Sequence, residues 1–287
     1  MSSGPPLNRV SSLRPDSATR PLFVHAHVPK SGGTSVNKLL HNWLRDRMQW
    51  MHFSDPIRML TRAEMDEYVS KNPEIDCITS HHFRVFPPII AGRPALYITF
   101  LRDPASFLIS LARHWIRDRA ELTPEFKAQL PPDFDQFDVI SLLRFWLDSA
   151  QRRANPEHLF GAEMALMFFE GTIKDLGFGT DTTTFSPSNE NWCRYLAKAI
   201  AITQLNQFFF VGDFATLTED IRELARRLQR FGIIADGFEI PWERRSTDQP
   251  FASAEEENAV RELIPAAFPV DRDIYAHFHR LRQDQPL

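Results

Sequence analysis

The chain has 287 residues, of which 43% are hydrophobic and 24% charged, so it can bury a sizeable core as one large domain or two small ones. Its formal net charge of −4 and sequence pI near 6.2 argue against nonspecific binding of nucleic acid, which needs a basic face. Two cysteines, Cys77 and Cys193, are too few for a disulfide framework or a multi-cysteine zinc site. These features favour a globular α/β enzyme that does not bind nucleic acid.

The first twenty residues are rich in Ser, Pro and Arg and lack the apolar core of a signal peptide, so we expect residues 1–20 to form a disordered leader. We expect residues 21–287 to form a single domain. No stretch approaches the ~18 consecutive apolar residues of a membrane span, so we expect no span and a cytoplasmic location.

The first chemical motif follows a strand-like apolar segment at residues 23–28. The sequence HVPKSGGTS runs from His27 to Ser35, and apolar residues then recur at helical spacing. Backbone N–H groups at a helix start, glycines that permit close approach, and the charge of Lys30 suit an anionic ligand. A nucleoside-triphosphate loop has its lysine after the last glycine, whereas Lys30 precedes Gly32 and Gly33. The segment therefore predicts a phosphate-binding loop of another kind.

A pair of histidines follows at the expected end of the next strand, in the segment Asp76 to Phe83 (DCITSHHF). Imidazole is suited to accepting a proton near neutral pH, so His81 and His82 are candidates for a general base. Such a pair is more often structural than catalytic. Its position between two phosphate motifs is what singles it out.

The second phosphate motif begins after Ala95 to Leu101, which predicts a buried strand. Arg102-Asp103-Pro104 ends this strand, and an apolar helical pattern follows. The Arg102 guanidinium can make bidentate contacts to a terminal phosphate, and the hydroxyl of Ser110, eight positions later, can donate one more hydrogen bond. Taken alone, the pattern also fits an ordinary strand followed by a helix with Pro near its first position.

Strands near Phe23, Ile75, Ala95 and Phe208 alternate with helical patterns along the chain. These patterns cover residues 34–47, 58–69, 105–119, 134–153, 192–203, 217–230, 254–263 and 271–282. The alternation predicts a central parallel sheet flanked by helices on both faces. Two irregular stretches, residues 121–132 and 171–191, are candidates for the acceptor side of a ligand crevice.

The loop at Lys30 resembles the 5′-phosphosulfate loop of sulfotransferases, in particular the carbohydrate O-sulfotransferase branch. Arg102 and Ser110 resemble the family's 3′-phosphate motif, although Phe107 stands where the family often carries another basic residue. The resemblance implies a P-loop-like three-layer fold. It also implies 3′-phosphoadenosine-5′-phosphosulfate as co-substrate, no metal ion, and a hydroxyl acceptor on a small molecule or glycan.

The resemblance also implies roles for individual residues. Lys30 would act in catalysis by neutralising the leaving phosphate, and His82, aligned on Phe83, would take the acceptor proton, with His81 as the alternative. Arg102 and Ser110 would bind the 3′-phosphate. The 5′-phosphosulfate would be held by Lys30, Ser31, Gly32, Gly33, Thr34 and Ser35.

Weaker landmarks of the family follow at residues 155–161, 208–212 and 274–278, and a loop with Arg244, Arg245 and Ser246 matches the family poorly. The histidines outside the pair receive no role. Two alternatives stay open. One is a P-loop-type kinase or NTPase in which Asp103 would hold Mg²⁺, and the other is a non-catalytic nucleotide-binding relative.

Overall fold

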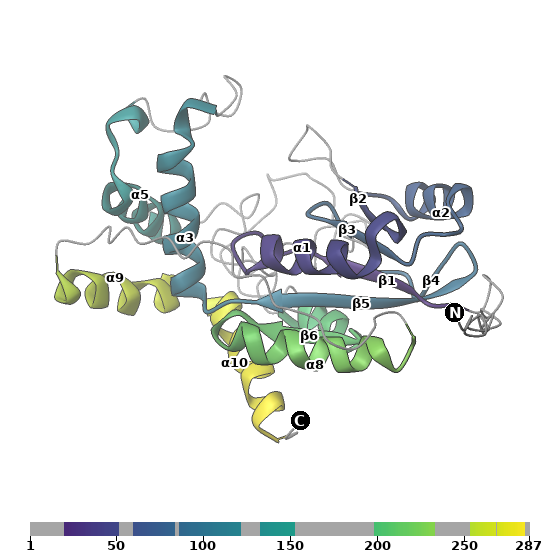
Figure 1. Ribbon diagram of the computed structural model, residues 1–287. Helices are drawn as coiled ribbons and strands as arrows, with labels where there is room; N and C mark the ends of the chain where they lie inside the picture. Colours follow the sequence, from purple (N-terminus) through teal and green to yellow (C-terminus); the bar gives the residue numbers. More distant parts are fainter. Residues whose placement is uncertain are drawn as a thin grey trace, which may run out of the picture.

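The computed structural model describes residues 20–51, 60–83, 86–121, 133–152, 198–232, 253–267 and 269–284 (Figure 1). Its centre is a six-stranded sheet in which β2, β3, β1, β5 and β6 lie side by side and run parallel. The strands are β1 (Leu22–Ala26), β2 (Met48–Trp50), β3 (Cys77–Ser80), β4 (Ile89–Ile90), β5 (Arg93–Leu101) and β6 (Phe210–Asp213). Only β4 is antiparallel, and it pairs with the beginning of β5.

The described helices account for most of the helical patterns in the sequence. They are α1 (Gly33–Leu44), α2 (Arg62–Lys71), α3 (Pro104–Arg117), α5 (Val139–Arg152), α8 (Leu217–Gln229), α9 (Ala254–Ala267) and α10 (Pro269–Asp284). Residues 198–205 are also helical. Short 3₁₀ turns lie at η1 (Arg45–Arg47), η2 (Arg119–Glu121), η3 (Phe134–Gln136) and η5 (Phe214–Thr216).

Helices cover the sheet on both faces, because β1 is buried along its whole length and its side chains alternate between two cores. Phe23 packs in one core with apolar residues of α1 and α8. Leu22 and Val24 belong to the other core, with Met65 of α2 and apolar residues of α3. The expected three-layer α/β fold with a central parallel sheet is confirmed.

The strand order places a topological switch point between β1 and β5. After β1 the chain forms β2 and β3 on one side, and it then crosses to β5 on the other side. Leu22 to His25 of β1 pair in register with Ala95 to Ile98 of β5. Ligands of such sheets bind in the crevice outside the carboxyl ends of the strands at this point. The loops that follow β1 and β5 carry Lys30 and Arg102, so both motifs lie at this crevice.

The amino ends of the same strands meet around a buried carboxylate. Asp76 lies just before β3 and pairs with Arg20, through Nε at 2.7 Å, and with Arg47. The Arg93 guanidinium of β5 lies 3.7 Å from Asp76 and donates to the carbonyl oxygens of Ile75, Arg20 and Pro21. Arg20 thus belongs to the folded part, one residue before the expected start of the domain at residue 21.

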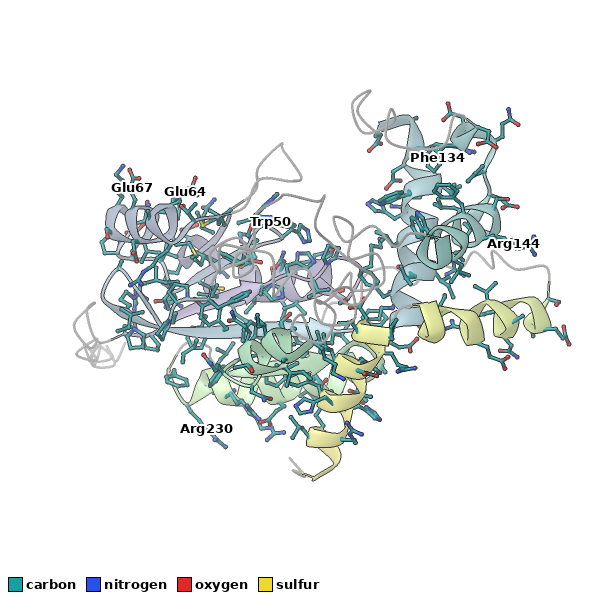
Figure 2. The ribbon with its side chains drawn as sticks, turned by 180° about the vertical axis from the view of Figure 1, so that it is seen from behind. Trp50, Glu64, Glu67, Phe134, Arg144 and Arg230 are labelled. Atoms are coloured by element: carbon teal, nitrogen blue, oxygen red, sulfur yellow. The ribbon has the colours of Figure 1, made fainter. Side chains whose placement is uncertain are left out.

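Beyond the carboxyl end of β5, α3 packs against α5 and α9 in a group of helices that projects from the sheet (Figure 1). The indoles of Trp115 and Trp146 join α3 to α5 in an edge-to-face contact with 5.1 Å between ring centroids. Figure 2 shows Phe134 and Arg144 on this projection, at the opposite end of the molecule from Glu64 and Glu67 of α2.

Two short strands, β2 and β4, were not expected from the sequence. β2 has only three residues and two of them are exposed, so it lacks the apolar run that indicates a buried strand. The loop at 171–191, most of the one at 121–132, the landmark at 155–161, Cys193 and the loop with Arg244, Arg245 and Ser246 lie outside the described residues. None of the described helices has the length and apolarity to cross a membrane.

Candidate functional site

The loop after β1 brings an uncapped helix start to the carboxyl edge of the sheet. Gly32 is the N-cap residue of α1 in the left-handed conformation, with φ of 80°, and no side chain caps the helix. The first helical hydrogen bond runs from the Val36 N–H to the Gly32 carbonyl oxygen, at 3.1 Å. The N–H groups of residues 33–35 therefore precede the first intrahelical hydrogen bond, and none of the side chains that the structure describes caps them. They are suited to an anionic ligand.

Both glycines of the loop are required by close neighbours. A Cβ on Gly33 would lie 1.7 Å from Nε2 of His27, because the imidazole packs directly against this residue. A Cβ on Gly32 would lie 2.9 Å from the ring of Phe214, and its positive φ disfavours any side chain. The paired glycines thus let His27 and Phe214 approach the backbone at the start of α1.

Arg102, at the end of β5, contacts the phosphate loop directly. Its Nη1 donates to the Lys30 carbonyl oxygen at 2.7 Å, and its guanidinium lies 4.2 Å from the ring centroid of Phe214. Its Nε is buried and has no hydrogen-bond partner among the residues that the structure describes. The two motifs expected to bind the two ends of one nucleotide therefore meet at the carboxyl edge of the sheet, and Arg102 retains an unused donor there.

Positively charged side chains gather around Lys30 and Arg102 at the carboxyl edge of the sheet. Burial lowers the pKa of Lys30, and the charges of Arg117 and Arg102 lower it further, against a smaller opposing effect of Asp118. Burial also lowers the pKa of Arg102 to about 10, which Asp103 opposes and the charges of Arg113 and Arg261 reinforce. In the described part of the chain neither Lys30 nor Arg102 forms an ion pair. An anion would relieve this repulsion between cations.

Ser110 lies half-buried on α3, on the face that also carries Ser106 and Arg117. Phe107 is buried and packs in the core, so the residue that departs from the family's basic position contributes to packing. Ser110 lies eight positions after Arg102, and its assignment to the 3′-phosphate stays a prediction.

Arg261 of α9 is a second basic residue near the start of α3, and no sequence pattern predicted its position there. Its Nη1 donates to Ser106 Oγ at 3.0 Å and lies 3.9 Å from Asp103. Asp103 is the N-cap of α3 and accepts a hydrogen bond from the Ser106 N–H at 2.8 Å. Its carboxylate is thus engaged in capping and faces a cation, which is unfavourable for holding Mg²⁺.

The two candidate bases differ in their surroundings. His82 is buried, with 4% of its surface exposed, and its backbone N–H donates to Ser80 Oγ. His81 is half-buried, and its ring lies against the phosphate loop, with Nδ1 at 2.7 Å from the His27 carbonyl oxygen. A carbonyl only accepts, so Nδ1 carries the ring proton and Nε2 is the basic nitrogen of neutral His81. The expected preference for His82 is not tested by these contacts, but they favour His81 for meeting a ligand.

The remaining loop residues have different exposures. Ser31 is buried and its hydroxyl donates to the Pro29 carbonyl oxygen at 3.4 Å, whereas Thr34 is exposed and Ser35 half-buried in the first turn of α1. Over the described residues, no group of three or more His, Cys, Asp or Glu side chains is placed to hold a metal ion.

Comparison with known proteins does not assign the chain to a family: no protein-family model matches it, and no curated protein matches it either. Functional inference therefore depends on the two motifs and on the geometry that joins them.

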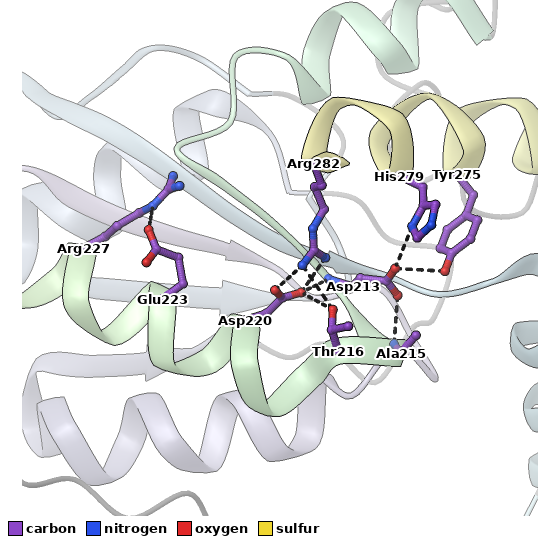
Figure 3. Close-up of polar contacts among 9 residues, drawn as sticks. All are labelled: Asp213, Ala215, Thr216, Asp220, Glu223, Arg227, Tyr275, His279 and Arg282. Atoms are coloured by element: carbon purple, nitrogen blue, oxygen red, sulfur yellow. Dashed lines mark hydrogen bonds and ion pairs between the residues drawn. The ribbon is translucent and has the colours of Figure 1, made fainter. Parts of the chain in front are cut away.

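A polar cluster at the end of β6 holds Phe214 in place (Figure 3). Asp213 accepts hydrogen bonds from the Ala215 N–H at 2.8 Å and from the Tyr275 hydroxyl of α10 at 2.9 Å. Asp220 of α8 accepts from Arg282 Nη1 at 2.6 Å, which ties α10 to α8. The closing helix α10 thereby fixes the turn that carries Phe214 against Gly32 and Arg102.

Proposed function

We propose that this protein is a sulfotransferase that moves the sulfuryl group of 3′-phosphoadenosine-5′-phosphosulfate onto a hydroxyl of a carbohydrate or similar polar acceptor. The observation that supports this most directly is the hydrogen bond from Arg102 to the Lys30 carbonyl oxygen, because it joins motifs that are 72 residues apart. A nucleotide with separate 5′ and 3′ phosphates needs two cationic groups at one crevice. The proposal keeps the cytoplasmic location expected from the sequence.

In the proposed reaction the acceptor oxygen attacks the sulfur while the bond from sulfur to the 5′-phosphate oxygen breaks. Adenosine 3′,5′-bisphosphate leaves, and the acceptor proton passes to an imidazole. Lys30 and the N–H groups at residues 33–35 stabilise the charge that develops on the leaving phosphate. Arg102 and Ser110 hold the 3′-phosphate and so align the donor with the acceptor.

We assign the proton transfer to His81 ahead of His82. Cys77 and Thr79 of β3 face α1, and His81 directly follows the strand with its ring 3.9 Å from that of His27. His27 opens the loop that leads into α1. The half-buried His81 ring thus lies beside the loop, with Nε2 as its basic nitrogen.

Calorimetric titration of the full chain tests the proposal. Adenosine 3′,5′-bisphosphate should bind well ahead of ATP or ADP with Mg²⁺, because the bisphosphate alone presents a phosphate to each motif. Lys30→Ala should weaken this binding, whereas Lys71→Ala should not, because Lys71 is an exposed residue of α2 paired with Glu67. Equal or tighter binding of ATP with Mg²⁺ would favour a kinase or NTPase.

A further inference from the structure

A buried polar network lies behind the candidate loop, and the proposed reaction does not use it. His25 lies in β1 and His27 directly follows this strand. Asn37 lies in α1 and Thr79 in β3. All four side chains are buried. Polar groups in such a position are maintained at a cost in desolvation, so their arrangement requires an explanation.

The Asn37 amide fixes the protonation of both imidazoles. Its oxygen accepts from the Thr79 hydroxyl at 2.8 Å and lies 2.7 Å from His25 Nδ1, which must therefore carry a proton. Its nitrogen donates to His27 Nδ1 at 3.2 Å, so the proton of a neutral His27 is on Nε2. One amide thus selects opposite tautomers for two histidines that stack with 5.4 Å between ring centroids.

His27 stays uncharged in this setting. Burial lowers its pKa well below the ordinary value, and the charges of His81, His25 and Lys30 lower it further. A second proton on Nδ1 would also confront the Asn37 amide nitrogen, which is itself a donor. His27 is thus unsuited to be the base, although it lies beside the loop.

His81 is held between His27 and an exposed indole. The rings of His27 and His81 lie 3.9 Å apart with an interplanar angle of 34°, and the His27 carbonyl oxygen accepts from His81 Nδ1. Trp50, at the end of β2 and 42% exposed, makes edge-to-face contacts with both rings, at 5.9 and 6.2 Å. These contacts restrict rotation of the His81 imidazole about its Cβ–Cγ bond.

We propose that Asn37 and His27 are positioning residues for His81: the Asn37 amide sets the tautomer of His27, and His27 then holds His81 with its proton on Nδ1 and its lone pair on Nε2. The use of Nε2 to accept a substrate proton rests on the proposed function. The tautomers of His27 and His81 and the orientation of the His81 ring do not depend on the proposed function, so the positioning role and the proposed function can be tested separately.

Nitrogen NMR of the imidazoles in the full-length chain, without any nucleotide, tests this proposal. The wild-type protein should show His27 protonated on Nε2, and His25 and His81 protonated on Nδ1. Asn37→Asp keeps the shape of the side chain but replaces the donor by an acceptor, so the His27 proton should move to Nδ1. His27 stays neutral in either tautomer, so the experiment reads the position of the ring proton and not a change in charge.

Thr79→Val is the matched control. It removes one hydrogen bond to Asn37 Oδ1 but leaves the donor to His27, so the tautomers of His27 and His81 should not change. A wild-type spectrum with His27 protonated on Nδ1 would overturn the proposal even if no variant folded. Retention of the His27 proton on Nε2 in folded Asn37→Asp would overturn it as well. If the spectra are as expected but the protein does not transfer a sulfuryl group, the result would reject the proposed function and leave the positioning role intact.

Discussion

The two ends of the parallel sheet both gather arginines, but they treat the charge in opposite ways. At the amino end, Arg20, Arg47 and Arg93 surround the buried carboxylate of Asp76, and main-chain carbonyl oxygens accept the remaining donors. At the carboxyl end, burial first and then the charges of other cations lower the pKa values of Lys30 and Arg102. The arginines at the amino end therefore have partners within the fold, whereas the cations at the carboxyl end are suited to an anion from outside.

The largest effect should separate the histidines at the carboxyl end. His81→Ala should lower turnover of the phosphosulfate donor by about 10²-fold to 10⁴-fold, the usual contribution of a general base. Affinity for adenosine 3′,5′-bisphosphate, measured by calorimetry, should be nearly unchanged, because the proposed role of His81 is to take the acceptor proton and not to hold the nucleotide. His82→Ala should retain substantial turnover. The reverse pattern would move the role to His82, and full activity in both variants would discard both assignments.

A substitution at the amino end of the sheet should lower the stability of the fold and leave binding of the bisphosphate unchanged. Asp76→Ala leaves three guanidinium groups without their shared counter-ion, so the free energy of unfolding should fall by about 3–5 kcal/mol. Urea unfolding measures this loss. Binding of the bisphosphate to the folded fraction should not change, because the opposite end of the sheet carries the crevice. A loss of affinity without a loss of stability would contradict the division between the two ends.

Arg102 should show the opposite response. Arg102→Met removes the guanidinium that contacts the Lys30 carbonyl and carries a buried, unused Nε. Affinity for the bisphosphate should fall about 10-fold to 100-fold, corresponding to the roughly 1.5–3 kcal/mol of a charged hydrogen bond. Calorimetry measures the change, with the exposed Arg222→Ala of α8 as control. Equal effects of the two substitutions would point to net charge and not to a specific contact.

Acid should destabilise the protein through the buried histidines behind the loop. Burial lowers the pKa of His25 from 6.5 to about 4, so the folded state resists a proton that the unfolded chain accepts. Stability is therefore fully present above about pH 6.5 and is lost as the pH falls toward about 4. His25 alone should contribute a loss of about 2 kcal/mol between about pH 8 and about pH 5. Urea unfolding across this range should show the decline, and His25→Gln should reduce it.

Chelation should have the smallest effect, because Lys30, Arg102 and the start of α1 supply the positive potential that a metal ion supplies in kinases. Turnover of the phosphosulfate donor should survive excess EDTA and should not rise with added Mg²⁺. Loss of turnover on chelation, restored by Mg²⁺ and sensitive to Asp103→Asn, would instead support a kinase-like role for that carboxylate.

Sequence reasoning worked best where a local pattern has a single structural outcome. The apolar run before the glycine-rich loop predicted β1, and helical spacing predicted α1, α3 and α8 within a few residues of their observed bounds. It also predicted that Lys30 and Arg102 would lie in the loops that follow two strands of the sheet. It could not identify Arg261, which lies 155 residues from its partner Ser106, because no local pattern marks a contact made between distant helices.

The sequence by itself determined the central parallel sheet with its alternating helices and the residue types in the loops after β1 and β5, because these depend on periodicity and on short-range backbone chemistry. Only the tertiary structure decided the strand order, the contact of Arg102 with the Lys30 loop, the burial of Phe107 and the contact of His81 with His27. It also brought His27 and Asn37 into a buried hydrogen-bond network that no sequence motif predicted. Strand register and packing decide such contacts, because they bring distant polar groups together in a buried place. Hydrogen bonds between them are stronger there than in water.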